Sequence, residues 1–197
     1  MKKFFVLIAA AIVSMSAMAQ VQFGAKVGVD LTNFWGEDAE HGMKPSYQAG
    51  LLMEYKFSPK FAIAPEVVFA SQGGKFKAVE LNMFGLDVSK TVTFNTNYIN
   101  VPVMLKYYAT PNFSIDFGPQ VGFNVYSKAS VEDEDTAWDL KDNTKAVDFG
   151  LGLGGTYNLT ENAFVQARYT LGMTKVFDGD YNKEKNGNIQ LAFGMKF

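Results

Sequence analysis

The feature that most constrains this chain is an alternation of bulky apolar residues with polar or small ones, repeated in eight segments. The last nine residues, 189–197, alternate in this way and stop on an aromatic, Phe197. Successive side chains of a strand point to opposite faces, so each segment predicts a strand with one apolar face. A last strand of this kind has to pair with the first, because lipid tolerates no unpaired edge. We therefore expect an all-β fold, an eight-stranded antiparallel up-and-down transmembrane β-barrel.

The predicted strands are close to the ~10 residues that a tilted strand needs to cross hydrocarbon. They cover residues 21–31, 47–57, 61–71, 97–107, 113–125, 147–157, 163–173 and 189–197. The connections alternate between long loops and short turns, beginning and ending with a long loop. This order predicts that the short turns and both termini are periplasmic and that the long loops are extracellular.

Alternation alone does not say which face points outward, and a soluble lipocalin-type barrel would place the apolar face inside. In this chain the charged face is also rich in Gly and Ala, whereas Phe, Tyr, Leu and Ile gather on the other. An eight-stranded barrel is only just wide enough inside for its side chains. Small and polar residues therefore suit the lumen, and the bulky apolar face suits lipid.

Residues 1–19 predict a cleaved signal peptide. Lys2 and Lys3 form a basic start, an apolar run follows, and the small residues before Gln20 predict cleavage between Ala19 and Gln20. Residues 20–197 then form the outer-membrane barrel domain. The chain has no Cys, which excludes disulfides and a lipid-modified N-terminal Cys. Its net charge of −2 argues against a nucleic-acid partner.

Ten charged side chains are predicted to face the lumen, five of each sign. They are Lys26, Lys56, Lys106, Arg168 and Lys196 against Asp30, Glu54, Glu66, Asp116 and Asp148. Balanced charges predict a sealed, bonded interior, because an unpaired buried charge is costly. A polar pathway for ions or protons is the alternative. The centre of the network is expected at Arg168 and Glu66, because Arg can bind a carboxylate through two hydrogen bonds.

Prolines and aromatics complicate the strand ends and interiors. Pro65, Pro102 and Pro119 fall inside predicted strands, where each removes a hydrogen-bond donor, so we expect bulges that could change which face a residue occupies. Aromatics near the short turns predict an interfacial girdle. Its predicted members are Tyr55, Phe57, Phe61, Tyr107, Tyr108, Phe113, Tyr157 and Phe197.

The second long loop contains two further strand-like segments, residues 75–81 and 88–94. They predict that the third and fourth strands continue beyond the membrane as a hairpin. Phe76, Met83 and Phe84 would be its apolar contact residues, and its free edges would suit a protein partner that adds a strand. The alternative is a hairpin packed against the other loops.

The sequence gives little support for a catalytic site or a metal site. The single His, His41, lies in the first long loop beside Glu40 and Asp38, and with a Ser it would form an acyl-transfer set. The charged lumen offers no apolar slot for an acyl chain. The acidic stretches 132–135 and 178–182 match no EF-hand loop. We therefore predict no enzyme activity, no catalytic residue, no bound metal and no cofactor.

Five segments resemble the PorT-like family of small outer-membrane barrels from Bacteroidota-type bacteria. They are FAIAPEVVFASQG (61–73), YINVPVMLKY (98–107), FGPQVGF (117–123), DFGLGLG (148–154) and ARYTLG (167–172). The resemblance implies a barrel in the outer membrane, and it brings no catalytic motif. The name-giving member is associated with a secretion system, a role that we do not transfer.

The expected function is therefore structural or adhesive: an outer-membrane barrel with a sealed polar lumen that supports the envelope or makes contacts through its extracellular loops. Expected partners are outer-membrane lipid and lipopolysaccharide, the barrel-assembly machinery through the C-terminal strand, and a protein partner at the second loop. The alternatives are a narrow pore, a barrel associated with secretion and, more remotely, a lipid A-modifying enzyme.

Overall fold

The computed structural model describes residues 20–35, 41–83, 86–131, 137–139, 144–176 and 185–197. Eight long strands and two short ones cover most of this part of the chain. In order they are β1 (Val21–Trp35), β2 (His41–Gly42), β3 (Lys44–Lys56), β4 (Phe61–Met83), β5 (Leu86–Thr110), β6 (Phe113–Val131), β7 (Ala137–Asp139), β8 (Val147–Asn158), β9 (Ala163–Lys175) and β10 (Lys185–Lys196). No helix in the described part has the length and apolar character to span a membrane.

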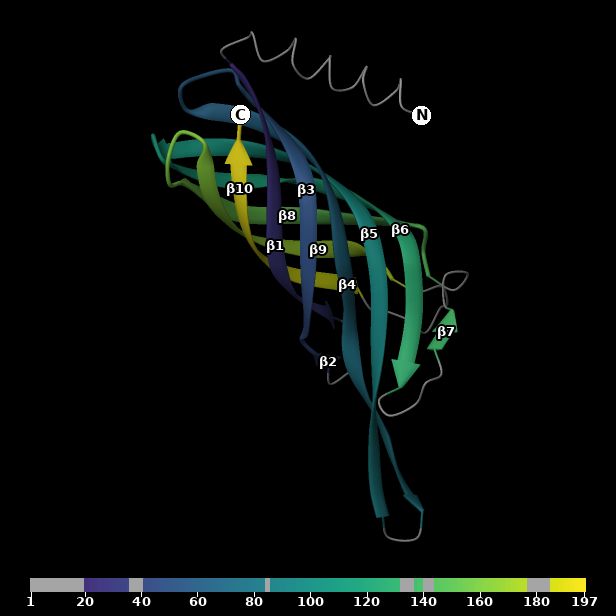
Figure 1. Cartoon of the computed structure of the whole chain (residues 1–197). Helices are drawn as coiled ribbons and strands as arrows, with labels where there is room; N and C mark the ends of the chain where they lie inside the picture. The colour runs from purple at the N-terminus through teal and green to yellow at the C-terminus, as the bar shows by residue number, and fades with distance from the viewer. Residues whose placement is uncertain (1–19, 36–40, 84–85, 132–136, 140–143, 177–184) are drawn as a thin grey trace.

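The eight long strands close into an antiparallel barrel, as the alternation predicted. Neighbours along the chain pair with one another, and β1 pairs with β10 from Gly24–Lys196 to Trp35–Lys185. The last residue joins this seam, because the Phe197 amide donates to the Phe23 carbonyl at 2.8 Å. Figure 1 shows β10 beside β1, so that the two ends of the sheet complete the ring.

The two faces of the barrel differ as an outer-membrane barrel requires. Large apolar side chains such as Val29, Leu51, Phe117, Leu153 and Phe193 are exposed on the outside. The inward positions between them carry the charged and amide side chains, most of them buried. A soluble lipocalin-type barrel needs the reverse arrangement. The structure therefore has the apolar face outward, in contact with lipid.

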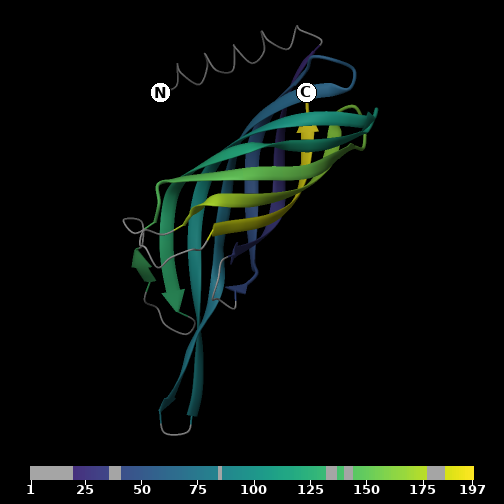
Figure 2. The same cartoon turned by 180° about the vertical axis from the view of Figure 1, so that it is seen from behind.

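The two ends of the barrel are unlike. Short turns at residues 57–60, 111–112 and 159–162 join β3 to β4, β5 to β6 and β8 to β9. Together with the end of β10 they form one rim, called here the short-turn rim (Figure 2). The other rim, called the long-loop rim, carries β2, β7 and the extensions of β4 and β5 (Figure 1). The two rims therefore expose different segments of the chain, short turns at one end and long loops and the hairpin at the other.

Strands β4 and β5 continue far past the barrel as the predicted hairpin. They contain 23 and 25 residues, about twice what crossing the membrane needs. Pairing between them runs out to Met83–Leu86, with a bulge between Ala78 and Leu81. The hairpin begins near Gly73, whose φ of 127° is a conformation that other residues rarely adopt. Figure 1 shows it projecting beyond every other strand.

The prediction of bulges at the three prolines is wrong. Pro65 pairs with Val103, Pro102 with Gln120 and Pro119 with Leu151, and the register is the same on both sides of each. Each proline instead leaves a gap in one ladder, as where β3–β4 pairing passes from Leu52–Glu66 directly to Tyr55–Ile63. The missing donor therefore interrupts hydrogen bonding without shifting the strands, and the predicted inward and outward faces hold on both sides.

Candidate functional site

The ten predicted lumen charges all lie on the inward positions of their strands. Eight are buried, and Lys56 and Asp148 are half-buried. They come from all eight barrel strands, so the barrel brings together residues far apart in the chain. Arg168 and Glu66, for example, are separated by 102 residues.

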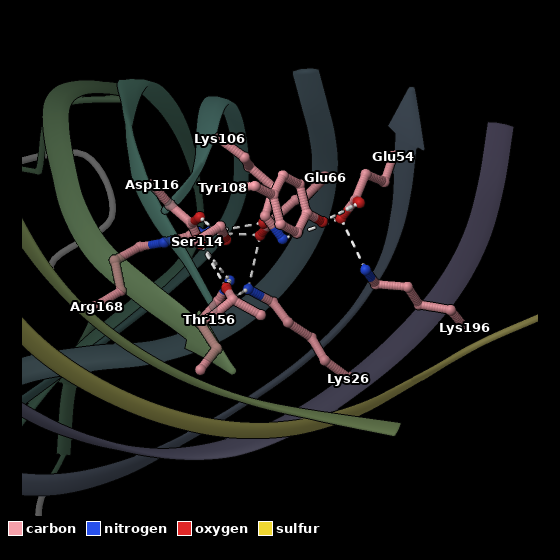
Figure 3. Close-up of polar contacts among 11 residues, drawn as sticks. Lys26, Glu54, Glu66, Lys106, Tyr108, Ser114, Asp116, Thr156, Arg168 and Lys196 are labelled. Carbon is pink, nitrogen blue, oxygen red and sulfur yellow. Dashed lines mark hydrogen bonds and ion pairs between the residues drawn. The ribbon is translucent and has the colours of Figure 1, made fainter. Parts of the chain in front are cut away.

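Glu66 is the centre of the first charge cluster. Arg168 donates from Nη2 to Oε1 at 2.7 Å and from Nη1 to Oε2 at 3.0 Å, the two-bond geometry favoured by Arg and carboxylates. Lys26 Nζ lies 2.6 Å from the same Oε2 (Figure 3). All three side chains are at most 2% exposed. Two cations thus bind one carboxylate in the middle of the barrel.

Glu54 is the centre of a second cluster nearer the short-turn rim. Lys106 and Lys196 donate to its Oε2 at 3.0 and 2.9 Å, and the Tyr108 hydroxyl donates to Oε1. Figure 3 shows these groups converging on Glu54 from different strands. Both carboxylate oxygens are therefore occupied, and Glu54 is fully buried.

Asp116 is connected to the Glu66 cluster through neutral groups. Its Oδ1 accepts from Ser114 Oγ at 2.6 Å and its Oδ2 from the Thr156 hydroxyl. Gln166 donates weakly to Asp116 Oδ2 at 3.4 Å and accepts from Lys26 at 2.9 Å. Thr156, Gln166 and Asp116 thus extend the Glu66 cluster with neutral hydrogen bonds. The Glu54 cluster lies beside it in the same lumen (Figure 3).

The remaining two carboxylates lie outside both clusters and bind amide groups. Asp30 accepts from Gln48 at 2.6 Å and from Asn188 at 3.5 Å. Asp148 accepts from Asn186 at 2.8 Å. In the described part neither forms an ion pair. The pairing of charges is therefore not one to one, because four cations share two glutamates while three aspartates bind neutral donors.

Unpartnered polar atoms concentrate on the long-loop side of these clusters. In the part that the structure describes, eight buried side-chain atoms have no hydrogen-bond partner: Gln48 Oε1, Thr96 Oγ1, Asn100 Nδ2, Asn124 Oδ1, Asp148 Oδ1, Arg168 Nε, Thr170 Oγ1 and Asn188 Oδ1. Apart from Arg168, each of these residues lies closer to the long-loop rim than the cluster residues on the same strand. On β9, for example, Thr170 follows Gln166 and Arg168.

Sequence reasoning missed most of the neutral members of the network. Tyr108 was predicted to belong to the aromatic girdle, which is wrong, because it points inward and is 5% exposed. Tyr108 lies two residues after Lys106 on β5, so the alternation of the strand already indicated that both point inward. Ser114, Thr156 and Gln166 also share inward parity with charged neighbours on β6, β8 and β9.

Several predicted sites lie outside the described residues. They include Ala19 of the cleavage site, Phe84, the acidic stretches 132–135 and 178–182, and the side chains of His41, Phe76 and Met83. Gln20 is described, and its carbonyl accepts from the Lys56 amide at 2.9 Å. Within the described part, no three His, Cys, Asp or Glu side chains gather as metal ligands.

Comparison with known proteins decides the family. Residues 14–178 match the model of the outer membrane protein beta-barrel domain. The chain belongs to this family. Its outward apolar face is therefore the lipid-facing surface of an outer-membrane barrel, and the soluble alternative is wrong. The narrower likeness to PorT-like barrels stays a prediction.

Solved outer-membrane barrels share the fold. Ail of Yersinia pestis is 16% identical with a TM-score of 0.52, and the match covers 90% of this chain and 99% of Ail. The Neisserial surface protein NspA is 13% identical with a TM-score of 0.54, covering 89% and 97%. A major outer membrane protein of Thermus thermophilus is 12% identical with a TM-score of 0.50, covering 90% and 99%. No curated protein sequence matches the chain.

Proposed function

We propose that this outer-membrane barrel is not an enzyme and acts by making contacts at the cell surface through the β4–β5 hairpin. The observation that carries the proposal is the pairing of the hairpin. The last pairs that other described strands make with it are His41–Phe76 on β4 and Val92–Val131 on β5. Beyond them, within the described residues, β4 and β5 pair only with each other.

An unpaired strand edge is a template for another strand. Both edges of the hairpin, along residues 77–83 and 86–91, offer free backbone groups to a protein partner that adds a strand. Short turns facing the periplasm would place this hairpin outside the cell. One solved structure of Ail contains a heparin analogue, sucrose octasulfate. At 16% identity that likeness supports the fold, and the hairpin edges support the surface role.

The bonded lumen supports a barrel that does not conduct. The barrel would insert through the assembly machinery by its C-terminal strand, with lipid and lipopolysaccharide around it. Each of the competing roles can be tested separately. A pore predicts conductance, a secretion role predicts periplasmic partners on co-purification, and a lipid A enzyme predicts that His41→Ala changes the lipid A profile.

Amide hydrogen exchange tests the surface role directly. Exchange is compared between native outer membranes and the purified barrel at those amides of residues 77–83 and 86–91 that the pairing of β4 with β5 leaves unbonded. Strand addition predicts slow exchange in the native membrane and fast exchange after purification. The control variant joins Phe76 to Val92 through Asn-Gly, which suits a two-residue hairpin turn, and it should keep the heat-dependent mobility of the barrel in SDS.

Two outcomes contradict the proposal. Slow exchange that persists in the purified barrel means that the hairpin packs on its own loops. Fast exchange in both preparations means that no partner adds a strand.

A further inference from the structure

The short-turn end of the lumen carries more positive than negative charge. Three ammonium groups, of Lys56, Lys106 and Lys196, share this end with two carboxylates, of Glu54 and Asp116. Glu54 already accepts from Lys106, Lys196 and Tyr108, and Asp116 accepts from Ser114 and Thr156. Lys56 forms no ion pair within the described residues. Its Nζ lies instead 4.3 Å from the centre of the Tyr108 ring.

The contact with the Tyr108 ring does not neutralise Lys56. A cation above an aromatic ring is attracted weakly to it and keeps its full charge. Lys56 is also half-buried, so water screens it less than a surface lysine. The inward face of β3 therefore presents an uncompensated positive charge at the mouth of the barrel.

Two depressions at the short-turn rim meet at Lys56. One, of about 380 Å³, is lined by Lys60, Tyr108, Thr110 and neighbouring turn residues. The other, of about 300 Å³, is lined by Lys196 and Glu161 together with the neutral side chains of Gln22, Asn112, Asn158 and Thr160. Three lysines thus line the two depressions, against one carboxylate.

We propose that this mouth binds an anion, a phosphate or carboxylate group that enters from the short-turn side. Lysine binds phosphate as a point charge, and hydroxyl and amide groups add hydrogen bonds. A cationic cleft with low-dielectric walls also raises the local concentration of anions. The site lies at the opposite end of the barrel from the hairpin, so it does not depend on the proposed surface role. With periplasmic short turns, its ligand is a periplasmic anion.

The test is a titration of the full-length barrel in lipid nanodiscs with inorganic phosphate, at constant ionic strength set by chloride. Backbone amide NMR shifts of residues 56–60, 110–112 and 158–161 report binding. We expect saturable shifts, with Lys56→Gln weakening binding about tenfold, the loss of one charge-assisted hydrogen bond. Lys56→Arg should bind within about threefold of the wild type, because the charge is kept.

Two further variants make the test specific. Lys145→Gln, at the long-loop rim, removes the same charge elsewhere and should bind phosphate as the wild type does. Glu161→Gln removes the one carboxylate that lines the mouth and should tighten binding. A second titration with acetate separates the two chemistries. Saturation by either anion supports the site, and the anion that binds more tightly identifies whether the site prefers phosphate or carboxylate.

The proposal is overturned if the wild type shows only the linear shifts of nonspecific screening. It is also overturned if Lys56→Gln binds as tightly as the wild type, or if Glu161→Gln weakens binding. Unchanged heat-dependent mobility in SDS verifies that each variant is folded. Lys56 forms no ion pair in the described part and Glu161 is exposed, so neither change removes a buried ion pair.

Discussion

The two halves of the lumen are equally polar in sequence and unlike in structure. Toward the short-turn rim, Glu54, Glu66 and Asp116 have each of their oxygens hydrogen-bonded. Toward the long-loop rim, Asp30 and Asp148 bind amides, and most of the unpartnered buried atoms belong to residues in the same half. Buried polar atoms of this kind take water in folded proteins. We infer that water occupies these positions in the long-loop half, called here the wet half, and we call the bonded short-turn half the plug.

This difference indicates which half of the lumen would seal the barrel that we propose. Charges close a narrow lumen only when opposite charges and hydrogen-bond donors meet with good geometry. Polar residues without such partners leave a path for water. A closed plug would separate the short-turn mouth from the wet half, so ligands on the two sides would not share a passage.

Breaking the central ion cluster has the largest expected effect. Glu66→Gln leaves Lys26 and Arg168 buried without a counter-charge. Removing one partner of a buried pair costs about 3–5 kcal/mol. We expect a loss of this size in the free energy of unfolding, measured by urea titration in lipid vesicles.

A matched variant separates charge from packing in this result. Replacing the whole cluster, with Lys26→Met, Glu66→Leu and Arg168→Met together, leaves no unpaired charge and should be close to wild-type stability. If this triple variant loses as much as Glu66→Gln, the cluster stabilises the barrel through packing and the charge argument is wrong.

Tyr108→Phe has the next largest effect. The change removes the hydroxyl that binds Glu54 and keeps the ring beneath Lys56. A hydrogen bond to a charged group contributes about 1.5–3 kcal/mol. We expect destabilisation toward the lower end of that range in the same urea titration. Wild-type stability would show that water replaces the hydroxyl at Glu54 and that the plug is open to solvent there.

Asp30→Asn makes the same chemical change as Glu66→Gln in the wet half. Asp30 binds two amides and forms no ion pair within the described part, so removing its charge strands no cation. We expect the free energy of unfolding to change by at most about 1 kcal/mol. A loss as large as that of Glu66→Gln would erase the distinction between the two halves.

Thr96→Val has the smallest expected effect. Thr96 is fully buried, and its hydroxyl has no hydrogen-bond partner among the described residues. A nearly isosteric apolar replacement should change stability by no more than about 0.5 kcal/mol. A larger loss, read from the urea midpoint, would indicate that the hydroxyl forms a bond essential to the long-loop half.

Alternation made the fold predictable, because a period of two fixes both strand type and face. It placed the ten lumen charges inside and most of the bulky apolar side chains outside, and strand-like segments in the second loop predicted the hairpin. Tyr98, Tyr108 and Phe164 are exceptions that point inward and are buried. The short strands β2 and β7 have two and three residues, too few to show a period. The prediction of bulges at the prolines was wrong because a missing hydrogen-bond donor does not require an extra residue. The strands keep their register, and one ladder lacks pairs beside each proline.

The partners inside the lumen were less predictable. Strand parity shows that Glu54 and Lys56 point inward, but it does not say which cation reaches which carboxylate. That choice depends on the stagger of neighbouring strands, which sets the height of each residue along the barrel. Lys106 and Lys196 arrive at the level of Glu54, so Lys56 is left toward the mouth. Three-dimensional placement alone reveals this surplus charge.

The central claim is that the bonded plug shuts the lumen, and single-channel recording in planar lipid bilayers tests it most directly. The wild-type barrel should give no steady conductance steps. The Glu54→Gln, Glu66→Gln double variant, which removes both cluster centres, serves as the comparison if it still shifts on heating in SDS. Reproducible conductance steps from the wild-type barrel would contradict the claim and make transport the leading function.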